Sequence, residues 1–251
     1  MLTAGVDLAA EAKGTALALI DWSNQGATLV GLTAGADDAT IVDAALGHGV
    51  AKLGVDCALG WPDEFVRFVA AHARHESSPA VDGGMDWRRS LAYRQTDREA
   101  RRITGRWPLS VSTDRLGLTA MRCAGLLARL EARGVEVDRA GGGLVVEVYP
   151  GASLRLWGFD TAGYRTDTDA RSALLQRLAE AAPWLSVAPF AELMVTSGDA
   201  FDAVIAALAA RNAALGLYAP PPLFYLARAR REGWMALPSS TLADLPAPPA
   251  A

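Results

Sequence analysis

Short apolar runs separated by turn-forming residues dominate the first part of the chain and predict β-strands. The predicted strands cover 2–8, 15–22, 27–33 and 52–56, and a helix from 37 or 38 to about 46 precedes the last of them. Because short turns join the first three strands, we expect an antiparallel meander, whereas the helix permits the fourth strand to return parallel to the first. The opening therefore predicts an α/β fold built on a mixed sheet.

Helical periodicity becomes prominent after residue 60. Apolar stripes and terminating glycines predict helices over 63–73, 116–133, 171–182 and 198–215, and apolar runs predict strands over 144–149 and 234–237. The segment from about 61 to 117 is less regular and is predicted to be a helical, arginine-rich insertion. We therefore expect one domain over 1–238 that carries this insertion, followed by a flexible Pro- and Ala-rich tail over 239–251.

The composition is that of a globular chain. Hydrophobic residues make up 51% and charged residues 21% of the 251 positions, which is enough for a sizeable core. Cys57 and Cys123 form no C-x-x-C motif, which argues against a thiolate zinc site or a disulfide framework and favours a reducing compartment. No apolar stretch approaches the roughly 20 residues of a membrane span, so we expect a cytoplasmic protein.

The charge balance restricts how the chain can bind nucleic acid. A net charge of −4 and a pI near 5.4 oppose binding through the overall field, so any such site must be local. Arginines interleaved with aromatic residues form one candidate patch: Arg88, Arg89, Arg94, Arg98, Arg101, Arg102 and Arg106. Such residues can pair with phosphates and stack on bases. The alternative is a solvated helix face whose arginines pair with neighbouring acids.

Four aspartates are the most informative candidates for chemistry. Asp7 and Asp56 each end a predicted strand, and parallel pairing of those strands places both at one edge of the sheet. Asp199 and Asp202 share one face of a predicted helix, three residues apart. Converging carboxylates repel one another unless a divalent cation such as Mg²⁺ or Mn²⁺ lies among them. The alternative is that Asp199 only caps its helix and Asp202 is a solvated first-turn residue.

Glu147 lies in an apolar strand between Val146 and Val148, a costly position for an ionised group. It is therefore a candidate metal ligand or a residue that supports the ligands. The alternative is a buried glutamate paired with an arginine from the insertion.

Several short motifs, in this order, resemble a family of predicted ribonuclease-H-like nucleases that is catalogued as a domain of unknown function. The motifs are Gly5-Val6-Asp7-Leu8-Ala9, Gly54-Val55-Asp56 with Leu59-Gly60-Trp61-Pro62, Arg94-Gln95-Thr96-Asp97-Arg98, Glu147-Val148-Tyr149-Pro150, Asp199-Ala200-Phe201-Asp202-Ala203 and Glu232-Gly233-Trp234. The resemblance covers residues 3 to about 238. The helix with Asp199 and Asp202 also looks like the final acidic helix of the Holliday-junction resolvase branch of that superfamily.

The resemblance implies a ribonuclease-H-like sheet flanked by helices and a nuclease that cleaves DNA or RNA with two divalent ions. Asp7 would bridge both ions, Asp56 would hold one, and Asp202, assisted by Asp199, would hold the other or position the attacking water. Glu147 would support this catalytic set. The third motif makes Arg94, Asp97 and Arg98 the candidates for substrate binding.

Two other function classes stay open. One is a non-catalytic nucleic-acid or nucleotide-binding module whose acids serve the structure. The other is an actin-like phosphoryl-transfer enzyme, although no second copy of the opening meander and no phosphate-binding G-x-x-x-x-G-K-[ST] motif occurs. No membrane partner is expected, and the oligomeric state stays open, a dimer included.

Overall fold

The computed structural model describes residues 1–47, 49–76 and 83–246. A six-stranded sheet with the order β5-β4-β1-β2-β3-β6 forms its centre. The strands are β1 (Leu2–Asp7), β2 (Ala16–Ser23), β3 (Gly26–Ala34), β4 (Val50–Asp56), β5 (Val145–Glu147) and β6 (Leu185–Ser186). β1, β2 and β3 form an antiparallel meander, while β4 pairs parallel with β1 and β5 parallel with β4. The predicted α/β, ribonuclease-H-like sheet is confirmed.

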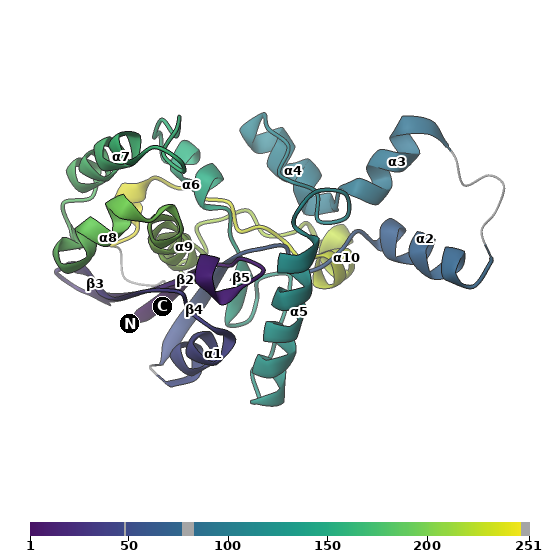
Figure 1. The fold of residues 1–251 in the computed structure, drawn as a ribbon, viewed down its shortest axis with the longest axis horizontal. Helices are drawn as coiled ribbons and strands as arrows, with labels where there is room; N and C mark the ends of the chain where they lie inside the picture. Colours follow the sequence, from purple (N-terminus) through teal and green to yellow (C-terminus); the bar gives the residue numbers. More distant parts are fainter. Residues whose placement is uncertain (48, 77–82, 247–251) are drawn as a thin grey trace.

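Helices cover both faces of this sheet (Figure 1). Their bounds are α1 (Asp38–Gly47), α2 (Asp63–Ala73), α3 (Gly84–Ala92), α4 (Gln95–Thr104), α5 (Gly117–Ala132), α6 (Pro150–Leu156), α7 (Thr168–Ala181), α8 (Ala191–Thr196), α9 (Gly198–Ala214) and α10 (Leu226–Glu232). α1 and α5 pack their apolar side chains on one face, and α6 to α9 cover the other. The sheet is therefore the middle layer of three.

α9 is the central helix of the molecule. Every residue from Ala200 to Ala213 is buried, because α9 packs against the sheet on one side and is covered by α6 and α8 on the other. Apolar residues around the whole circumference, alanines above all, allow such complete burial.

Two glycines let α9 approach the sheet closely. A Cβ atom at Gly5 would lie 2.1 Å from the backbone nitrogen of Ala207, and one at Gly54 would lie 2.6 Å from the carbonyl oxygen of Ala206. Only a residue without a side chain fits either position. Because side chains alternate along a strand, the residues two positions later, Asp7 and Asp56, lie on the same face as these glycines. The close packing thus points both aspartates toward α9.

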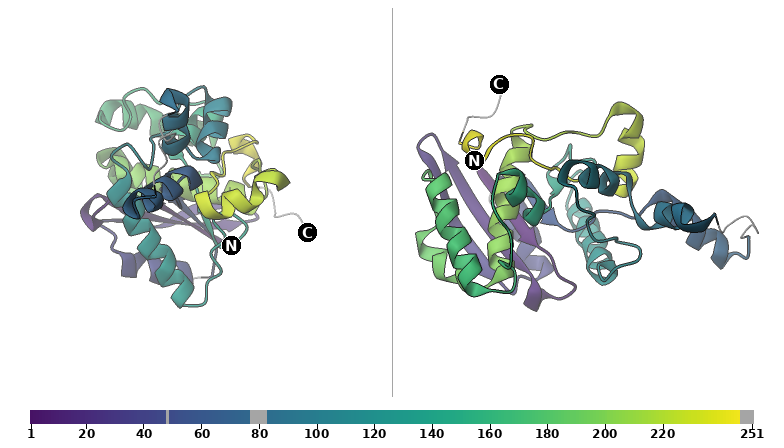
Figure 2. Two further views of the ribbon diagram at one scale, coloured as in Figure 1. Left: turned by 90° about the vertical axis from the view of Figure 1, so that its right-hand side faces the viewer. Right: turned by 90° about the horizontal axis from the view of Figure 1, so that it is seen from above.

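The insertion extends away from this body. α2 and α3 project to one side, and α4 lies closer to the sheet (Figures 1 and 2). The predicted helix over 63–73 matches α2. α3 and α4 lie in the predicted helical insertion, for which the sequence predicted no further helix bounds. None of the helices in the described ranges is long and apolar enough to cross a bilayer.

The C-terminal segment differs from the prediction in two places, the tail after residue 238 and the strand over 234–237. The tail was predicted to be flexible from 239, but Leu242 and Leu245 are buried in the apolar cluster formed by β2, β3 and α6 to α9. The packed chain therefore extends to about 246, and residues 247–251 lie outside the described residues. The predicted strand over 234–237 is reduced to an isolated bridge between Met235 and Glu147.

Candidate active site

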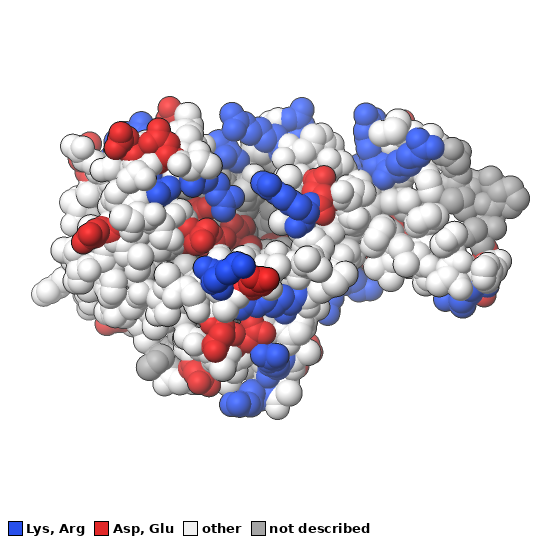
Figure 3. Space-filling model, in the orientation of Figure 1, with Lys and Arg blue, Asp and Glu red and all other residues white. Residues whose placement is uncertain are grey.

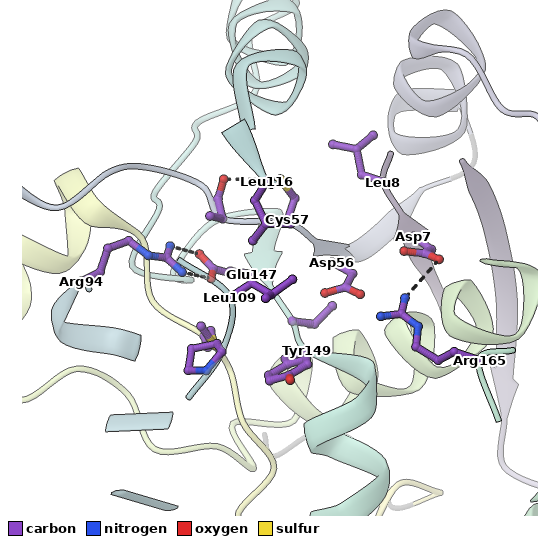
Figure 4. Close-up of a pocket in the computed structure, with 14 residues that line it drawn as sticks. Asp7, Leu8, Asp56, Cys57, Arg94, Leu109, Leu116, Glu147, Tyr149 and Arg165 are labelled. Carbon is purple, nitrogen blue, oxygen red and sulfur yellow. Dashed lines mark hydrogen bonds and ion pairs between the residues drawn. The ribbon is translucent and has the colours of Figure 1, made fainter. Parts of the chain in front are cut away.

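Asp7 and Asp56 are direct neighbours at the carboxyl ends of two parallel strands. They are register partners in the β1–β4 pair, one at the last residue of each strand. Asp7 is 7% exposed. Both side chains line one cavity, where they lie beside the guanidinium of Arg165 (Figure 4). The structure therefore brings these two predicted site residues together.

α9 contributes a third carboxylate, Asp202, which is fully buried. Its Oδ1 accepts a hydrogen bond of 2.8 Å from the Tyr164 hydroxyl. Its Oδ2 forms an ion pair with Arg165 Nη2 at 2.7 Å. The same Nη2 lies 3.9 Å from Asp7 Oδ2. A single guanidinium thus links two of the three acids, and we refer to Asp7, Asp56 and Asp202 as the acidic cluster.

The acidic cluster holds more negative charge than its surroundings favour. Burial, with repulsion from Asp56 and Asp202, raises the pKa of Asp7 to about 9. Burial and repulsion from Asp202 raise the pKa of Asp56 to about 8. Burial also raises the pKa of Asp202, to about 6, although Arg165 and the Tyr164 hydroxyl oppose the shift. Arg165 therefore neutralises the cluster only in part.

Asp199 stands apart from the other three aspartates. It lies exposed in the first turn of α9, where the Ser197 side chain caps the helix. Its charge still raises the pKa of Asp7 and of Asp202. The structure thus places Asp199 at the margin of the acidic cluster rather than inside it.

Glu147 pairs with Arg94, which is the alternative that the sequence left open. Arg94 Nη1 and Nη2 donate to the two carboxylate oxygens of Glu147 at 2.8 and 2.7 Å. Arg94 Nη2 and Nε also donate to Asp97, at 2.8 and 3.2 Å. All three side chains are at most 2% exposed. In this arrangement Arg94 and Asp97, both predicted to bind substrate, contact each other, and Arg94 also contacts Glu147.

Glu232 completes this buried network, and the sequence did not single out its role. Its Oε1 accepts a hydrogen bond from the backbone nitrogen of Asp63 and its Oε2 one from that of Gln95, at 2.8 and 2.9 Å. Its own carbonyl oxygen accepts a hydrogen bond of 3.0 Å from Arg94. The network therefore ties the start of α2, the start of α4 and the end of α10 to β5, beside the acidic cluster.

Three arginines of the predicted basic patch contact neighbouring residues of the insertion. Arg98 donates to the carbonyl oxygen of Arg89 at 3.3 Å, and Arg89 and Arg102 form exposed ion pairs with Asp86 and Glu99 on their own helices. On the face in Figure 3, acidic side chains gather in a central hollow, and basic side chains lie around it. Arg89, Arg98 and Arg102 therefore make these contacts within the insertion.

A cavity of about 200 Å³ opens beside the acidic cluster. Asp7, Asp56 and Arg165 line one side of it, and the Arg94–Glu147 pair lies on another (Figure 4). Its remaining wall is mostly apolar and consists of Leu8, Cys57, Ala58, Pro108, Leu109, Leu116, Val148, Tyr149 and Met235. The cavity offers carboxylates to a reacting group and an apolar surface to the rest of a ligand.

The donor set of the acidic cluster fits a hard divalent cation, although its side chains are not arranged around one. Among the residues that the structure describes, no three His, Cys, Asp or Glu side chains adopt a metal-binding arrangement. The carboxylates nonetheless lie close together, and the buried Asp202 Oδ2 has the Arg165 guanidinium as its neighbour at 2.7 Å. Mg²⁺ and Mn²⁺ prefer such oxygen ligands. Binding would require Arg165 to move from its position against Asp202.

A family model described as "Protein of unknown function (DUF429)" matches residues 5–223. The chain belongs to this family. A search of curated proteins found no match, and a search of solved structures found none either. The match includes the acidic cluster, Tyr164 and Arg165 but ends before Glu232. Since the family description assigns no activity, membership leaves the chemistry of the cluster to be inferred from its geometry.

Tyr164 and Arg165 are site residues that the sequence did not reveal. Both lie in the irregular segment between α6 and α7, which has neither periodicity nor a recognisable motif. Only the three-dimensional contact of Arg165 with Asp202 and Asp7 identifies it.

Proposed function

We propose that this protein is a metal-dependent nuclease that hydrolyses phosphodiester bonds of DNA or RNA at the acidic cluster. The observation that carries the proposal is the meeting of three carboxylates from β1, β4 and α9: Asp7 and Asp56 line one cavity, and Arg165 links Asp202 to Asp7 at its edge. The raised pKa values of Asp7 and Asp56 support it, because they indicate a shortage of positive charge at the cluster. A divalent cation would supply that charge.

Each carboxylate has a place in the proposed reaction. Asp7 lies beside Asp56 in the sheet and near Arg165, which reaches Asp202, so Asp7 is suited to a central ligand position. The Tyr164 hydroxyl holds Asp202 Oδ1, and Oδ2 would serve as the ligand atom once Arg165 moves away from it. When bound, two divalent ions would activate water and neutralise the leaving oxygen. Asp199, at the margin, is suited to orient a water molecule.

One observation favours a second candidate, a binding module without metal chemistry. Arg165 already forms an ion pair with Asp202 at 2.7 Å, and a buried acid paired in this way can serve the structure alone. In that case the carboxylates would need no cation. The two candidates differ in how the protein responds to metal.

Thermal melting with and without millimolar Mn²⁺ or Mg²⁺ tests the metal site. Binding only to the folded state raises the melting temperature, and we expect such a rise for the wild type and none for Asp7→Asn. Asp43→Asn is the matched control, because Asp43 is exposed on α1 and has the same change in charge. A melting temperature unmoved by either ion in the wild type would contradict the metal site and favour the binding module.

Cleavage assays with Mn²⁺ test the activity itself on single-stranded, duplex and branched DNA, on RNA and on RNA–DNA hybrids. Residues that act as one unit lose activity non-additively, so Asp7→Asn, Asp202→Asn and the double variant should be almost equally inactive. Cleavage that is undiminished in Asp7→Asn would locate the activity elsewhere. Metal binding without cleavage of any substrate would reject the nuclease proposal.

A further inference from the structure

A second groove lies next to the acidic cavity and shares Tyr149 and Arg165 with it. It has a volume of about 310 Å³. The residues that line it include Arg106, Arg155 and Arg165 beside Tyr149, Gly151 and Thr166. Three of these are arginines and none is a carboxylate, so the groove differs sharply in charge from the cavity beside it.

Arg155 has buried hydrogen-bond donors in this groove that lack an acceptor within the described chain. Its guanidinium carbon lies 5.7 Å from the centre of the Tyr149 ring. Its Nε and Nη2 atoms are buried, and within the described chain they donate no hydrogen bond. Donors on a buried cation carry a desolvation cost that an anionic acceptor would offset. The contact with Tyr149 stabilises the position of the guanidinium but leaves these donors without an acceptor.

Arg106 adds a second cation from another element. It follows Gly105, whose left-handed backbone (φ 72°) ends α4 and turns the chain toward the groove. The Arg106 side chain is exposed, and no ion pair joins it to an acid in the described ranges. Arg165 is the third cation, and it lies at the boundary with the acidic cavity.

We propose that this groove binds a backbone phosphate of a nucleic-acid strand, with Arg155 and Arg106 donating to its non-bridging oxygens. A strand held there passes Arg165 and presents the next phosphodiester to the acidic cluster. Guanidinium groups suit this task, because their donors match the oxygens of a phosphate. The inference rests on the proposed nuclease function for the identity of the strand, whereas the anion site rests on the groove itself.

Fluorescence anisotropy with a labelled single-stranded DNA oligonucleotide tests the proposal. EDTA is present throughout, so that neither metal binding nor cleavage enters the result. We expect Arg155→Gln and Arg106→Gln each to weaken binding about tenfold, as the loss of one charged hydrogen-bonding group predicts. Each should also reduce the slope of log affinity against log salt by about 0.7, the value for one contact on a single strand.

Control variants separate this effect from general loss of charge or of folding. Arg133→Gln removes the same charge from the exposed end of α5, outside the groove, and should bind like the wild type. Arg155→Lys keeps the positive charge, so its slope of log affinity against log salt should equal that of the wild type rather than that of Arg155→Gln. Because Arg106 is exposed, its variant is expected to fold normally, which a melting curve verifies. Inorganic phosphate as competitor should displace the oligonucleotide only weakly if a strand, rather than a free anion, is the ligand.

Two results would overturn the proposal. One is wild-type protein that does not bind the oligonucleotide in EDTA. The other is binding by Arg155→Gln and Arg106→Gln that equals the Arg133→Gln control in both affinity and salt slope. Neither result depends on cleavage, so a failure of the nuclease activity is recognised separately.

Discussion

At the scale of single residues, the buried side chain of Arg94 connects several elements of the fold. It is 2% exposed and contacts Asp97, Glu147 and the backbone of Glu232. Asp97 also accepts a hydrogen bond from the Arg94 backbone nitrogen, so the pair starts α4 as well as joining it to β5. Arg94 therefore positions the wall of the cavity beside the acidic cluster without reaching the cluster itself.

Replacing Arg94 by alanine should destabilise the protein by about 3–5 kcal/mol, because two buried carboxylates would lose their partner. Urea unfolding measures the loss. Arg98→Ala is the matched control from the same helix: its side chain makes one backbone hydrogen bond near the surface, so a change within about 0.5 kcal/mol is expected. Equal stability of Arg94→Ala and wild type would mean that the buried network contributes nothing to folding.

The acidic cluster could be predicted from the sequence residue by residue, and its counter-charge could not. Asp7 and Asp56 end apolar strands, and Asp202 lies on a helix among apolar residues, so each has a local signal. Arg165 has none, because its place is fixed by an irregular segment whose path depends on the packing of α6 and α7. Arg94 was recognised as a motif residue, but its sequence context did not distinguish a substrate ligand from the buried partner of Glu147.

At the scale of elements, the repeated Gly-Val-Asp pattern links packing to chemistry. Gly5 and Gly54 allow α9 to lie against β1 and β4, and Asp7 and Asp56 follow two residues later on the same face. A strand with a larger residue at either position would hold α9 away from the sheet. Asp202 would then lie farther from the other two acids.

Gly5→Ala should therefore be severely destabilising, by about 3 kcal/mol or more, since the new Cβ meets backbone atoms of α9 rather than a flexible side chain. Gly31→Ala is the control on β3, where the nearest atom to a Cβ is the Leu19 side chain at an ordinary 3.5 Å. Melting temperatures of both variants provide the measurement. A Gly5→Ala protein as stable as Gly31→Ala would show that α9 can withdraw without cost.

Long, periodic elements were predictable, and short or charged ones were not. α2 and α9 match their predicted ranges closely, and the meander and its parallel return strand are in the predicted order. β6 has only two residues and is held by two register pairs with β3, too little for a sequence signal. α6 begins at Pro150, directly after the predicted strand over 144–149, because proline is favoured in the first turn of a helix; the sequence alone predicted no helix there.

At the scale of the whole molecule, the acidic cluster links stability to pH. The folded-state pKa values of Asp7, Asp56 and Asp202 are about 9, 8 and 6, all above the value of 3.8 for an unperturbed aspartate. A raised pKa means that the folded state binds protons more tightly than the unfolded state. The corresponding stability is present in full below pH 4 and is lost as pH rises through these values.

Without metal, the free energy of unfolding of the wild type should therefore fall relative to that of Asp7→Asn as pH rises from about 4 to 9. Urea unfolding at several pH values in EDTA measures the difference, which isolates the titration of Asp7. If the proposed metal site exists, the Mn²⁺-induced rise in melting temperature should be larger at pH 8 than at pH 6, because the ligands must lose their protons. A difference between the two proteins that does not change with pH would contradict the raised pKa of Asp7.

The packing of α9 also has a consequence for how the chain is made. Thr3 of β1 donates a hydrogen bond to the carbonyl oxygen of Ala207 across 204 residues of sequence. During synthesis the first strands leave the ribosome long before α9 exists, so the face that α9 later covers stays uncovered through most of translation. Contacts of such long range form slowly and leave apolar strand surface open to aggregation meanwhile. Because α9 supplies both the central core helix and Asp202, the core and the acidic cluster are completed at the same time, near the end of synthesis.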